Sequence, residues 1–248
     1  MDLGLRNRVA LVTGASSGIG AATARLLAEE GADVVIAFGR DETGARQTMA
    51  AVESAGRCAW LCRFDIADAA AVAVAISSIC AQTGGLDVLV LCAGHNIVTP
   101  LIDITPEEWS TIIGVNLNGS FYTLRAAIPF LRDGAAVVTV ASVAATTGAP
   151  HHAHYAAAKA GLVNLTKSAA RALAPRVRVN CVAPGIALTP MGRDTVASLP
   201  PDYAQTKLAL QRYAEPDEIA RCIVFLASPA ASFVTGATLD VNGGREMR

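Results

Sequence analysis

The sequence predicts an α/β fold, a single domain with a doubly wound parallel β-sheet of about seven strands and helices on both faces. Short apolar runs of strand length alternate with alanine-rich helical segments along the chain. The runs are too continuously apolar for a sheet with one solvated face, which indicates that helices bury both sides. The chain contains no linker, repeat or low-complexity segment, so we expect residues 1–248 to form one domain.

Composition excludes several classes of protein. The chain is 52% hydrophobic and 17% charged, which allows a large core and argues against disorder. Its net charge is −1 without a basic block, so we expect no binding to nucleic acid or to a membrane surface. The apolar runs fall well short of the ~18 residues that span a bilayer. No signal peptide is evident and the cysteines are scattered, which predicts a cytoplasmic protein with free thiols.

The first elements read as strand 9–13, a glycine-rich turn, a helix over 19–30 and strand 33–38. This order is typical of dinucleotide-binding folds, in which glycines let the backbone approach a pyrophosphate at a helix N-terminus. The same turn also matches the G-x-S-x-G nucleophile elbow of hydrolases. That alternative leaves Gly20 unexplained. The expected cofactor contacts in this turn are Gly14, Ser16, Ser17, Gly18, Ile19 and Gly20.

The end of the second strand bears on the choice of cofactor. An acidic residue at this point accepts a hydrogen bond from a ribose hydroxyl and favours NAD, whereas an arginine favours the 2′-phosphate of NADP. Phe38 stands where the acid is expected, and Arg40 follows two residues later. Arg40 as a solvated loop charge is the alternative. We therefore predict that NADP(H) is favoured, with NAD(H) possible.

Further candidates follow later strands and helices. Asp65 ends a strand over 59–64, where it would accept from the adenine amino group or, like Asp68, cap the next helix. Thr105 and Glu108 predict a helix start with a capping box. The remaining elements are expected at 43–55, 69–82, 88–92, 105–131, 136–141, 155–173, 178–183, 216–226 and 238–241. The polar, proline-broken stretch 189–213 is predicted to be a mobile lid over the substrate.

Tyr155 and Lys159 lie four residues apart in a predicted helix, so they share one face. A cation within roughly 4–6 Å of a phenol favours the phenolate. Such a tyrosine can give or take a proton near neutral pH. An ordinary surface pair is the alternative for this spacing taken alone.

These motifs together resemble the classical type of the short-chain dehydrogenase/reductase family, over nearly the whole chain. The shared motifs are Thr13-Gly-x-x-x-Gly-x-Gly20, Asp65, Asn116, Ser142, Tyr155-x-x-x-Lys159, and Pro184-Gly185 followed by Thr189. The resemblance implies a single Rossmann domain. Within the family, the chain is most similar to the branch of 3-oxoacyl-(acyl-carrier-protein) reductases and glucose dehydrogenases.

The resemblance implies roles for four residues. Tyr155 would be the general acid or base, and Lys159 would lower its pKa and hold the nicotinamide ribose. Ser142 would stabilise charge on the substrate oxygen, and Asn116 would hold a water in a proton relay. The cofactor contacts implied elsewhere are Ile66, Cys92, Ala93, Gly94, Pro184, Gly185, Ala187 and Thr189, with Arg40 and Asp65. The sequence departs from the family at Cys92, where asparagine is usual, and at Ala187, where isoleucine or valine is common.

The predicted function is hydride transfer between NADP(H) and a small ketone or secondary alcohol. The alternative is a non-catalytic dinucleotide-binding sensor or regulatory protein. The family resemblance also implies a homotetramer that pairs the Asn116 and Tyr155 helices. The histidines before Tyr155 and after the fourth strand are either loop residues without a function or residues that line the substrate pocket. No metal site is predicted, because no carboxylate is paired with these histidines. The candidate substrate residues are His95, Ala144, His152 and His154.

Overall fold

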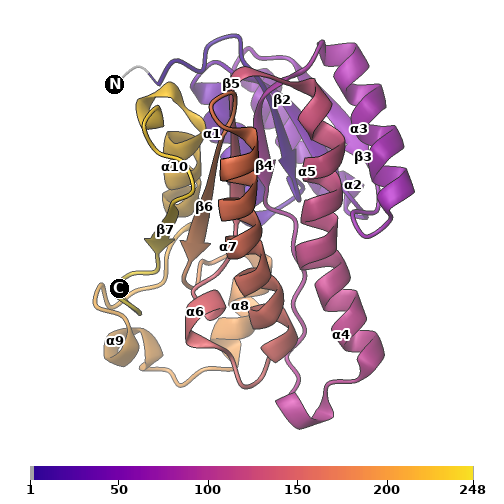
Figure 1. Cartoon of the computed structure of the whole chain (residues 1–248). Helices are drawn as coiled ribbons and strands as arrows, with labels where there is room; N and C mark the ends of the chain where they lie inside the picture. The colour runs from indigo at the N-terminus through magenta and orange to yellow at the C-terminus, as the bar shows by residue number, and fades with distance from the viewer. Residues whose placement is uncertain (1–2, 248) are drawn as a thin grey trace.

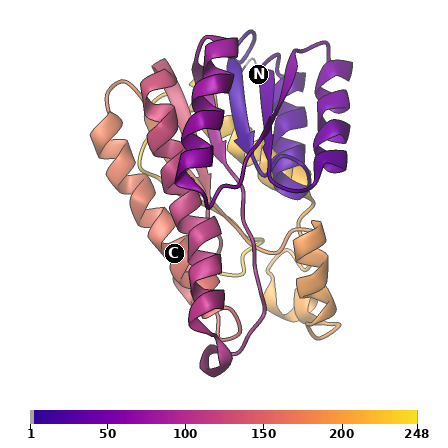
Figure 2. The ribbon, with the colours of Figure 1, turned by 90° about the vertical axis from the view of Figure 1, so that its right-hand side faces the viewer.

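The computed structural model describes residues 3–247. Its sheet has seven strands, all parallel, in the order β3-β2-β1-β4-β5-β6-β7 (Figures 1 and 2). The strands are β1 (Val9–Thr13), β2 (Asp33–Phe38), β3 (Ala59–Arg63), β4 (Leu86–Leu91), β5 (Leu131–Val140), β6 (Arg178–Pro184) and β7 (Thr238–Val241). The predicted doubly wound parallel sheet is therefore confirmed.

Helices cover both faces of the sheet (Figures 1 and 2). One core joins the sheet to α1 (Gly18–Glu29), α2 (Glu42–Ser54) and α10 (Pro216–Ala227). The other joins it to α3 (Ala69–Thr83), α5 (Gly119–Ala127) and α7 (Ala153–Leu173). The shorter elements are η1 (Leu101–Asp103), α4 (Pro106–Ile113), η2 (Gly114–Asn118), η3 (Ile128–Phe130), α6 (Ala144–Thr147), α8 (Pro190–Ala197), α9 (Tyr203–Lys207) and η4 (Pro229–Ala231).

Alternation along the strands sends side chains into both cores. In β2, Val34 and Ile36 join the core under α1, while Val35 joins the core under α3. All three side chains are fully buried. Burying each such side chain contributes about 1.5–3 kcal/mol, so both cores hold the strands in place.

The helix predicted over 105–131 is divided into four segments: α4, η2, α5 and η3. The middle segment, η2, is a π-helical turn that contains the buried Asn116. Thr105 caps α4 by accepting from the main-chain N–H of Glu108 at 3.2 Å, as the sequence predicts. π-Turns inside helices frequently occur at functional sites, and this one changes the direction in which the chain presents Asn116.

The carboxyl ends of all seven strands lie at the same edge of the sheet because the strands are parallel. The strand order reverses between β1 and β4, and ligands of open α/β sheets bind outside the carboxyl ends at such a point. The stretch 189–213 follows β6 at this edge and contains α8 and α9. Within residues 3–247, a helix with the length and hydropathy of a membrane span is absent.

Candidate active site

The glycine-rich turn after β1 packs closely against two other segments. Gly14 and Gly18 have positive φ angles of 67° and 55°, which glycine adopts without strain. A Cβ at Gly14 would lie 2.8 Å from Ala93 Cα, and one at Gly18 would lie 2.9 Å from Thr189 Cγ2. Ser17, at the start of α1, makes no side-chain cap, so main-chain N–H groups stay open to an anion. The turn therefore fits a pyrophosphate.

Thr13, the last residue of β1, holds the turn that follows β4. Its hydroxyl accepts from the main-chain N–H groups of Cys92 at 3.0 Å and Ala93 at 3.1 Å. The same hydroxyl donates to the carbonyl oxygen of Val90 at 3.3 Å. Thr13 thus tethers the turn that contains Cys92, a role that a lone threonine at a strand end does not reveal.

Tyr155 and Ser142 are brought together at this edge of the sheet. Tyr155 lies in the first turn of α7 and Ser142 follows β5, so the Ser142 hydroxyl is close enough to the phenol to lower its pKa. Ser142 Oγ accepts from the main-chain N–H of Ala144 at 3.2 Å, which fixes the hydroxyl. Burial raises the pKa of Tyr155 to about 12, and the Ser142 hydroxyl offsets only part of that effect. In the free protein the phenol is therefore protonated and able to donate.

Lys159 lies one helical turn after Tyr155, and its side chain is buried. Its Nζ donates to the carbonyl oxygen of Val140 at 2.8 Å and lies 5.5 Å from the centre of the Tyr155 ring. Burial lowers the pKa of Lys159 to about 8. The expected lowering of the Tyr155 pKa by Lys159 is not found in the free protein, because desolvation of the phenol dominates.

Asn116 is fully buried and fixed by three hydrogen bonds. Its Nδ2 donates to the carbonyl oxygens of His95 at 2.7 Å and Ile112 at 2.9 Å, while Oδ1 accepts from the His95 N–H at 3.3 Å. A Cβ at the exposed Gly94 would lie 2.9 Å from Asn116 Oδ1 and 3.5 Å from Lys159 Nζ. The structure thus gathers the amide, the ammonium and an open backbone surface that a cofactor can approach.

The ends of β2 and β3 present the expected ribose and adenine contacts. Phe38 is buried, whereas Arg40 is exposed, and its side chain makes no hydrogen bond or ion pair with any of residues 3–247. Asp41 caps α2 by accepting from the Gly44 N–H at 2.9 Å. Asp68 caps α3. Asp65 is exposed, and one oxygen of its carboxylate accepts from the Ala67 N–H.

Residues after β6 complete the edge. A Cβ at Gly185 would lie 2.9 Å from Asn242 Cα, so this turn packs against the chain that follows β7. Ala187 is buried and forms an isolated bridge with Ala214. Thr189 caps α8 by accepting from the Gly192 N–H at 3.0 Å. Two further expected cofactor contacts lie at different strands. Pro184 ends β6, and Ile66, which follows β3, packs its side chain on Gly119.

The histidines have different environments. His95 is exposed, and His152 lies edge-on to the Tyr155 ring at 6.4 Å, with its buried Nδ1 unpaired within residues 3–247. The expectation that His154 lines the substrate pocket is wrong, because its ring is fully buried and hydrogen-bonded to Glu108. Ala144 is buried beside Ser142. In the described part of the chain, His, Cys, Asp and Glu side chains form no group of three that would hold a metal ion.

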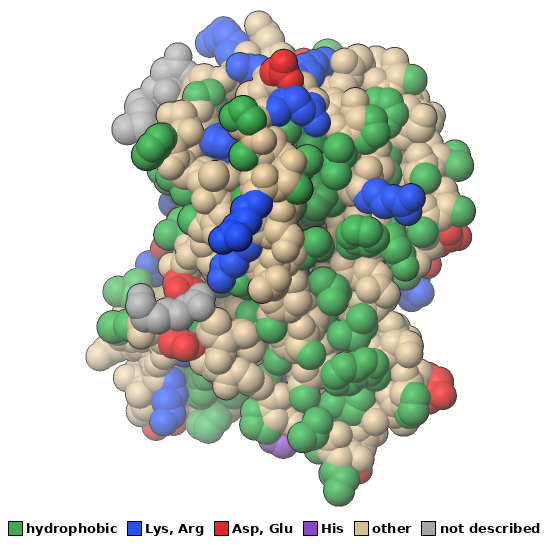
Figure 3. Space-filling model, viewed as in Figure 1, with side chains coloured by type: hydrophobic (Ala, Val, Ile, Leu, Met, Phe, Trp, Pro, Cys, Tyr) green, Lys and Arg blue, Asp and Glu red, His purple; other side chains and the backbone are tan. Residues whose placement is uncertain are grey.

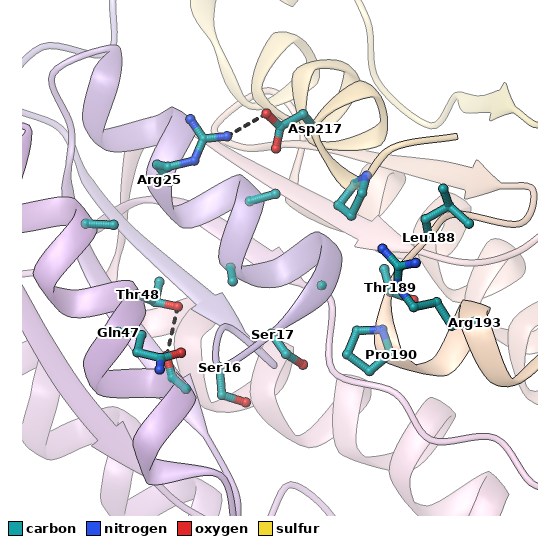
Figure 4. Close-up of a pocket in the computed structure, with 16 residues that line it drawn as sticks. Ser16, Ser17, Arg25, Gln47, Thr48, Leu188, Thr189, Pro190, Arg193 and Asp217 are labelled. Atoms are coloured by element: carbon teal, nitrogen blue, oxygen red, sulfur yellow. Dashed lines mark hydrogen bonds and ion pairs between the residues drawn. The ribbon is translucent and has the colours of Figure 1, made fainter. Parts of the chain in front are cut away.

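A cavity of about 570 Å³ adjoins the glycine-rich turn (Figure 4). Ser16, Ser17 and Thr189 line it, and so do Arg25 and Asp217, which form an ion pair of 2.7 Å. Tyr155 does not line it. The cavity is continuous with the phosphate end of the expected cofactor site and separate from the proton-handling groups.

The doubly wound sheet, the glycine-rich turn and the tyrosine beside a buried lysine define a class of dinucleotide-dependent oxidoreductases. Residues 14–246 match a family model described as enoyl-(acyl carrier protein) reductase. The chain is 45% identical to cis-4-hydroxycyclohexanecarboxylate dehydrogenase of Sinomonas cyclohexanicum, over 96% of both chains. It is 38% identical to a 3-oxoacyl-(acyl-carrier-protein) reductase of Staphylococcus aureus, over 96% of this chain and 98% of that one.

Solved structures agree. A glucose/ribitol dehydrogenase of the short-chain type from Brucella melitensis superposes with a TM-score of 0.94 at 38% identity, over 100% of both chains. A short-chain dehydrogenase from Burkholderia cenocepacia, in complex with NADP, gives 0.91 at 34% identity, over 99% of both. The chain belongs to the short-chain dehydrogenase/reductase family. It is an NAD(P)-dependent oxidoreductase that acts on small molecules.

Proposed function

We propose that the protein transfers a hydride between NADP(H) and a ketone or secondary alcohol, with Tyr155, Ser142, Lys159 and Asn116 as the reacting site. The observation that carries this proposal is the position of the buried Lys159, whose Nζ lies 5.5 Å from the centre of the Tyr155 ring, with the Ser142 hydroxyl on the same edge of the sheet. A non-catalytic dinucleotide sensor, the alternative, has no use for a hydroxyl held beside the phenol.

The proposed chemistry uses each group once. In ketone reduction, Ser142 donates a hydrogen bond to the substrate oxygen and stabilises the charge that develops on it. Tyr155 gives its proton to that oxygen, which its raised pKa allows. Lys159 stabilises the resulting phenolate by its charge, and Asn116 holds the backbone of His95 beside this pair. When bound, the cofactor supplies the hydride, or accepts it in the reverse reaction.

The cofactor would lie along the carboxyl edge of the sheet. Backbone N–H groups at Ser17 and Gly18 would hold the pyrophosphate, and Asp65 would accept from the adenine amino group. Three observations favour NADP(H) over NAD(H). Arg40 is exposed at the end of β2 with its guanidinium unpaired within residues 3–247, and Asp41 is already engaged as a helix cap. A relative with 34% identity was solved with NADP.

We further propose that the substrate is a ring-bearing secondary alcohol or ketone with a carboxylate. The relative with 45% identity is named for such a hydroxy acid. Arg245 lies over the Tyr203 ring at 5.9 Å. Burial lowers the pKa of His152 beside Tyr155, and the charge of Arg245 adds a smaller effect in the same direction. A hydrogen bond of 3.1 Å from Thr146 to Glu246 ties this C-terminal segment to α6. In this proposal, Arg245 would pair with the carboxylate of the substrate.

Three further expectations belong to the same proposal. The segment 189–213 acts as a lid over the substrate, and the protein works in the cytoplasm. It assembles as a homotetramer through the face formed by α4, α5 and α7. Hydrophobic side chains gather over this area in Figure 3, and Trp109 and Phe121 are 42% and 43% exposed there. Light scattering of the purified protein tests the assembly.

The experiment that tests the function is a fluorescence titration with NADPH and NADH, followed by a panel of ketones and alcohols with the tighter cofactor. We expect tighter binding of NADPH and turnover of cyclic hydroxy acids or their ketones. Arg245→Gln should raise KM for carboxylate-bearing substrates and leave KM for their uncharged analogues unchanged. Binding of cofactor without turnover of any substrate on the panel would support the sensor instead.

A further inference from the structure

His154, the residue directly before Tyr155, is a buried histidine with both ring nitrogens engaged. Nδ1 accepts from the main-chain N–H of Tyr155 at 2.8 Å. A neutral imidazole has one accepting and one donating nitrogen, so Nε2 carries the proton. Nε2 lies 2.8 Å from a carboxylate oxygen of Glu108 and donates to it. The ring therefore links a carboxylate on α4 to the backbone of Tyr155.

This arrangement replaces the usual cap at the start of α7. The first N–H groups of a helix lack acceptors within the helix, and the N-cap side chain normally supplies one. His152, the N-cap of α7, makes no such bond. Tyr155 is the third residue of the helix, and its open N–H is satisfied by His154 instead.

Glu108 takes part at a matching position. It is the third residue of α4, where the sequence predicts that its carboxylate returns to the N-cap to complete a capping box. The carboxylate instead bonds to His154 at 2.8 Å. The Thr99 side chain and His154 both lower the pKa of this carboxylate. The two helix starts are therefore joined to each other through Glu108 and His154.

The two helices carry the groups of the proposed reaction. α4 leads through the π-turn to Asn116, and α7 carries Tyr155 and Lys159. We propose that Glu108 and His154 form a positioning pair that fixes the backbone of Tyr155 relative to the Asn116 helix and so orients the phenol for proton transfer. The inference rests on the proposed role of Tyr155. His154 does not touch the substrate, because its ring is fully buried.

Kinetics of variants test the pair. His154→Ala and Glu108→Ala should each lower kcat about ten- to a hundredfold, the scale of a small misplacement of a reacting group. The Kd for NADPH should stay unchanged. The double variant should be no slower than the worse single variant, since both remove one link. Unchanged kcat in His154→Ala, losses that multiply in the double variant, or a parallel loss of NADPH affinity would overturn the proposal.

Conservative variants separate positioning from packing. Glu108→Gln keeps an oxygen that accepts from Nε2 and should retain most of kcat. His154→Asn places its amide oxygen near the position of Nδ1 and should retain more of kcat than His154→Gln, which reaches only toward Glu108. If Ala, Asn and Gln at position 154 give the same kcat, the ring's contact with the Tyr155 N–H has no role.

Amide hydrogen exchange provides a readout that needs no turnover. In the cofactor-free protein, a peptide covering 152–160 should exchange faster in His154→Ala and Glu108→Ala than in the wild type, and at the wild-type rate in Glu108→Gln. Wild-type exchange in both alanine variants would contradict the pair even where the protein is active. A wild-type protein that turns over no substrate would contradict the proposed function while exchange still decides the pair.

Discussion

Lys159 Nζ donates to the main-chain carbonyl oxygen of Val140 at 2.8 Å, and the lysine side chain is buried. A carbonyl dipole stabilises an ammonium only in part, so burial still lowers the pKa of Lys159 from 10.5 to about 8. The bond directs the ammonium toward the last residue of β5, beside Ser142. Burying the lysine at the reacting site therefore lowers the free energy of unfolding.

Stability should depend on pH through Lys159. Its pKa is lower in the folded than in the unfolded protein, so the unfolded state binds more protons between about pH 8 and 10.5. The free energy of unfolding should therefore rise with pH through this window, by at most about 3 kcal/mol. Below pH 8 the full penalty for burying the ammonium is present.

Urea unfolding of the cofactor-free wild type and of Lys159→Met, at several values from pH 7 to 10, measures this. The difference between the two proteins is the relevant quantity. Buried thiols at Cys62, Cys80 and Cys92 have pKa values raised to about 11 and reduce stability above pH 9 in both proteins. A difference that stays constant across the range would show that Lys159 has an ordinary pKa.

Tyr155→Phe should lower kcat at least about a hundredfold, the usual contribution of a positioned general acid or base. The phenyl ring keeps its contacts with His152 and Lys159, so the Kd for NADPH should not change. Stopped-flow reduction of a cyclic ketone, together with fluorescence titration, gives both values. Appreciable turnover in this variant would mean that the proton comes from another group.

Arg40→Ala should weaken NADPH binding by about 1–3 kcal/mol, the scale of a hydrogen bond to a charged group. NADH lacks the 2′-phosphate, and its Kd should stay close to that of the wild type. Arg63, exposed at the end of β3, provides a matched control. Its side chain donates to the Gly39 carbonyl oxygen, so Arg63→Ala should affect both cofactors to the same extent. Equal losses for both cofactors in Arg40→Ala would rule out the phosphate contact.

Thr13→Val should destabilise the turn after β4, because it leaves the N–H groups of Cys92 and Ala93 without their acceptor. Leaving a buried donor unpaired costs about 1–3 kcal/mol. We expect a lower melting temperature and weaker binding of either cofactor, measured by thermal unfolding and titration. Thr13→Ser retains the hydroxyl and should bind the cofactor like the wild type. If the valine variant binds NADPH normally, Thr13 does not position the turn.

Sequence determined a large part of this protein. Continuously apolar runs of strand length specify the strands, since such runs cannot be left in water. Glycines at 14 and 18 specify the first turn, because positive φ and close approach allow no side chain. The spacing of Tyr155 and Lys159 places both on one helical face without reference to the rest of the chain. These are local rules, and each acts within a few residues.

Tertiary structure decided the rest. The sequence leaves open whether Glu108 caps its own helix. Packing of α4 on α7 brings the His154 ring within hydrogen-bonding distance of the Glu108 carboxylate. The direction of the pKa shift of Tyr155 depends on how completely the phenol is desolvated, which helical spacing does not reveal. The partners of Thr13 lie 79 and 80 residues away, in the turn that follows another strand. Hydrogen bonds and desolvation are set by neighbours in space, and only the folded chain brings those neighbours together.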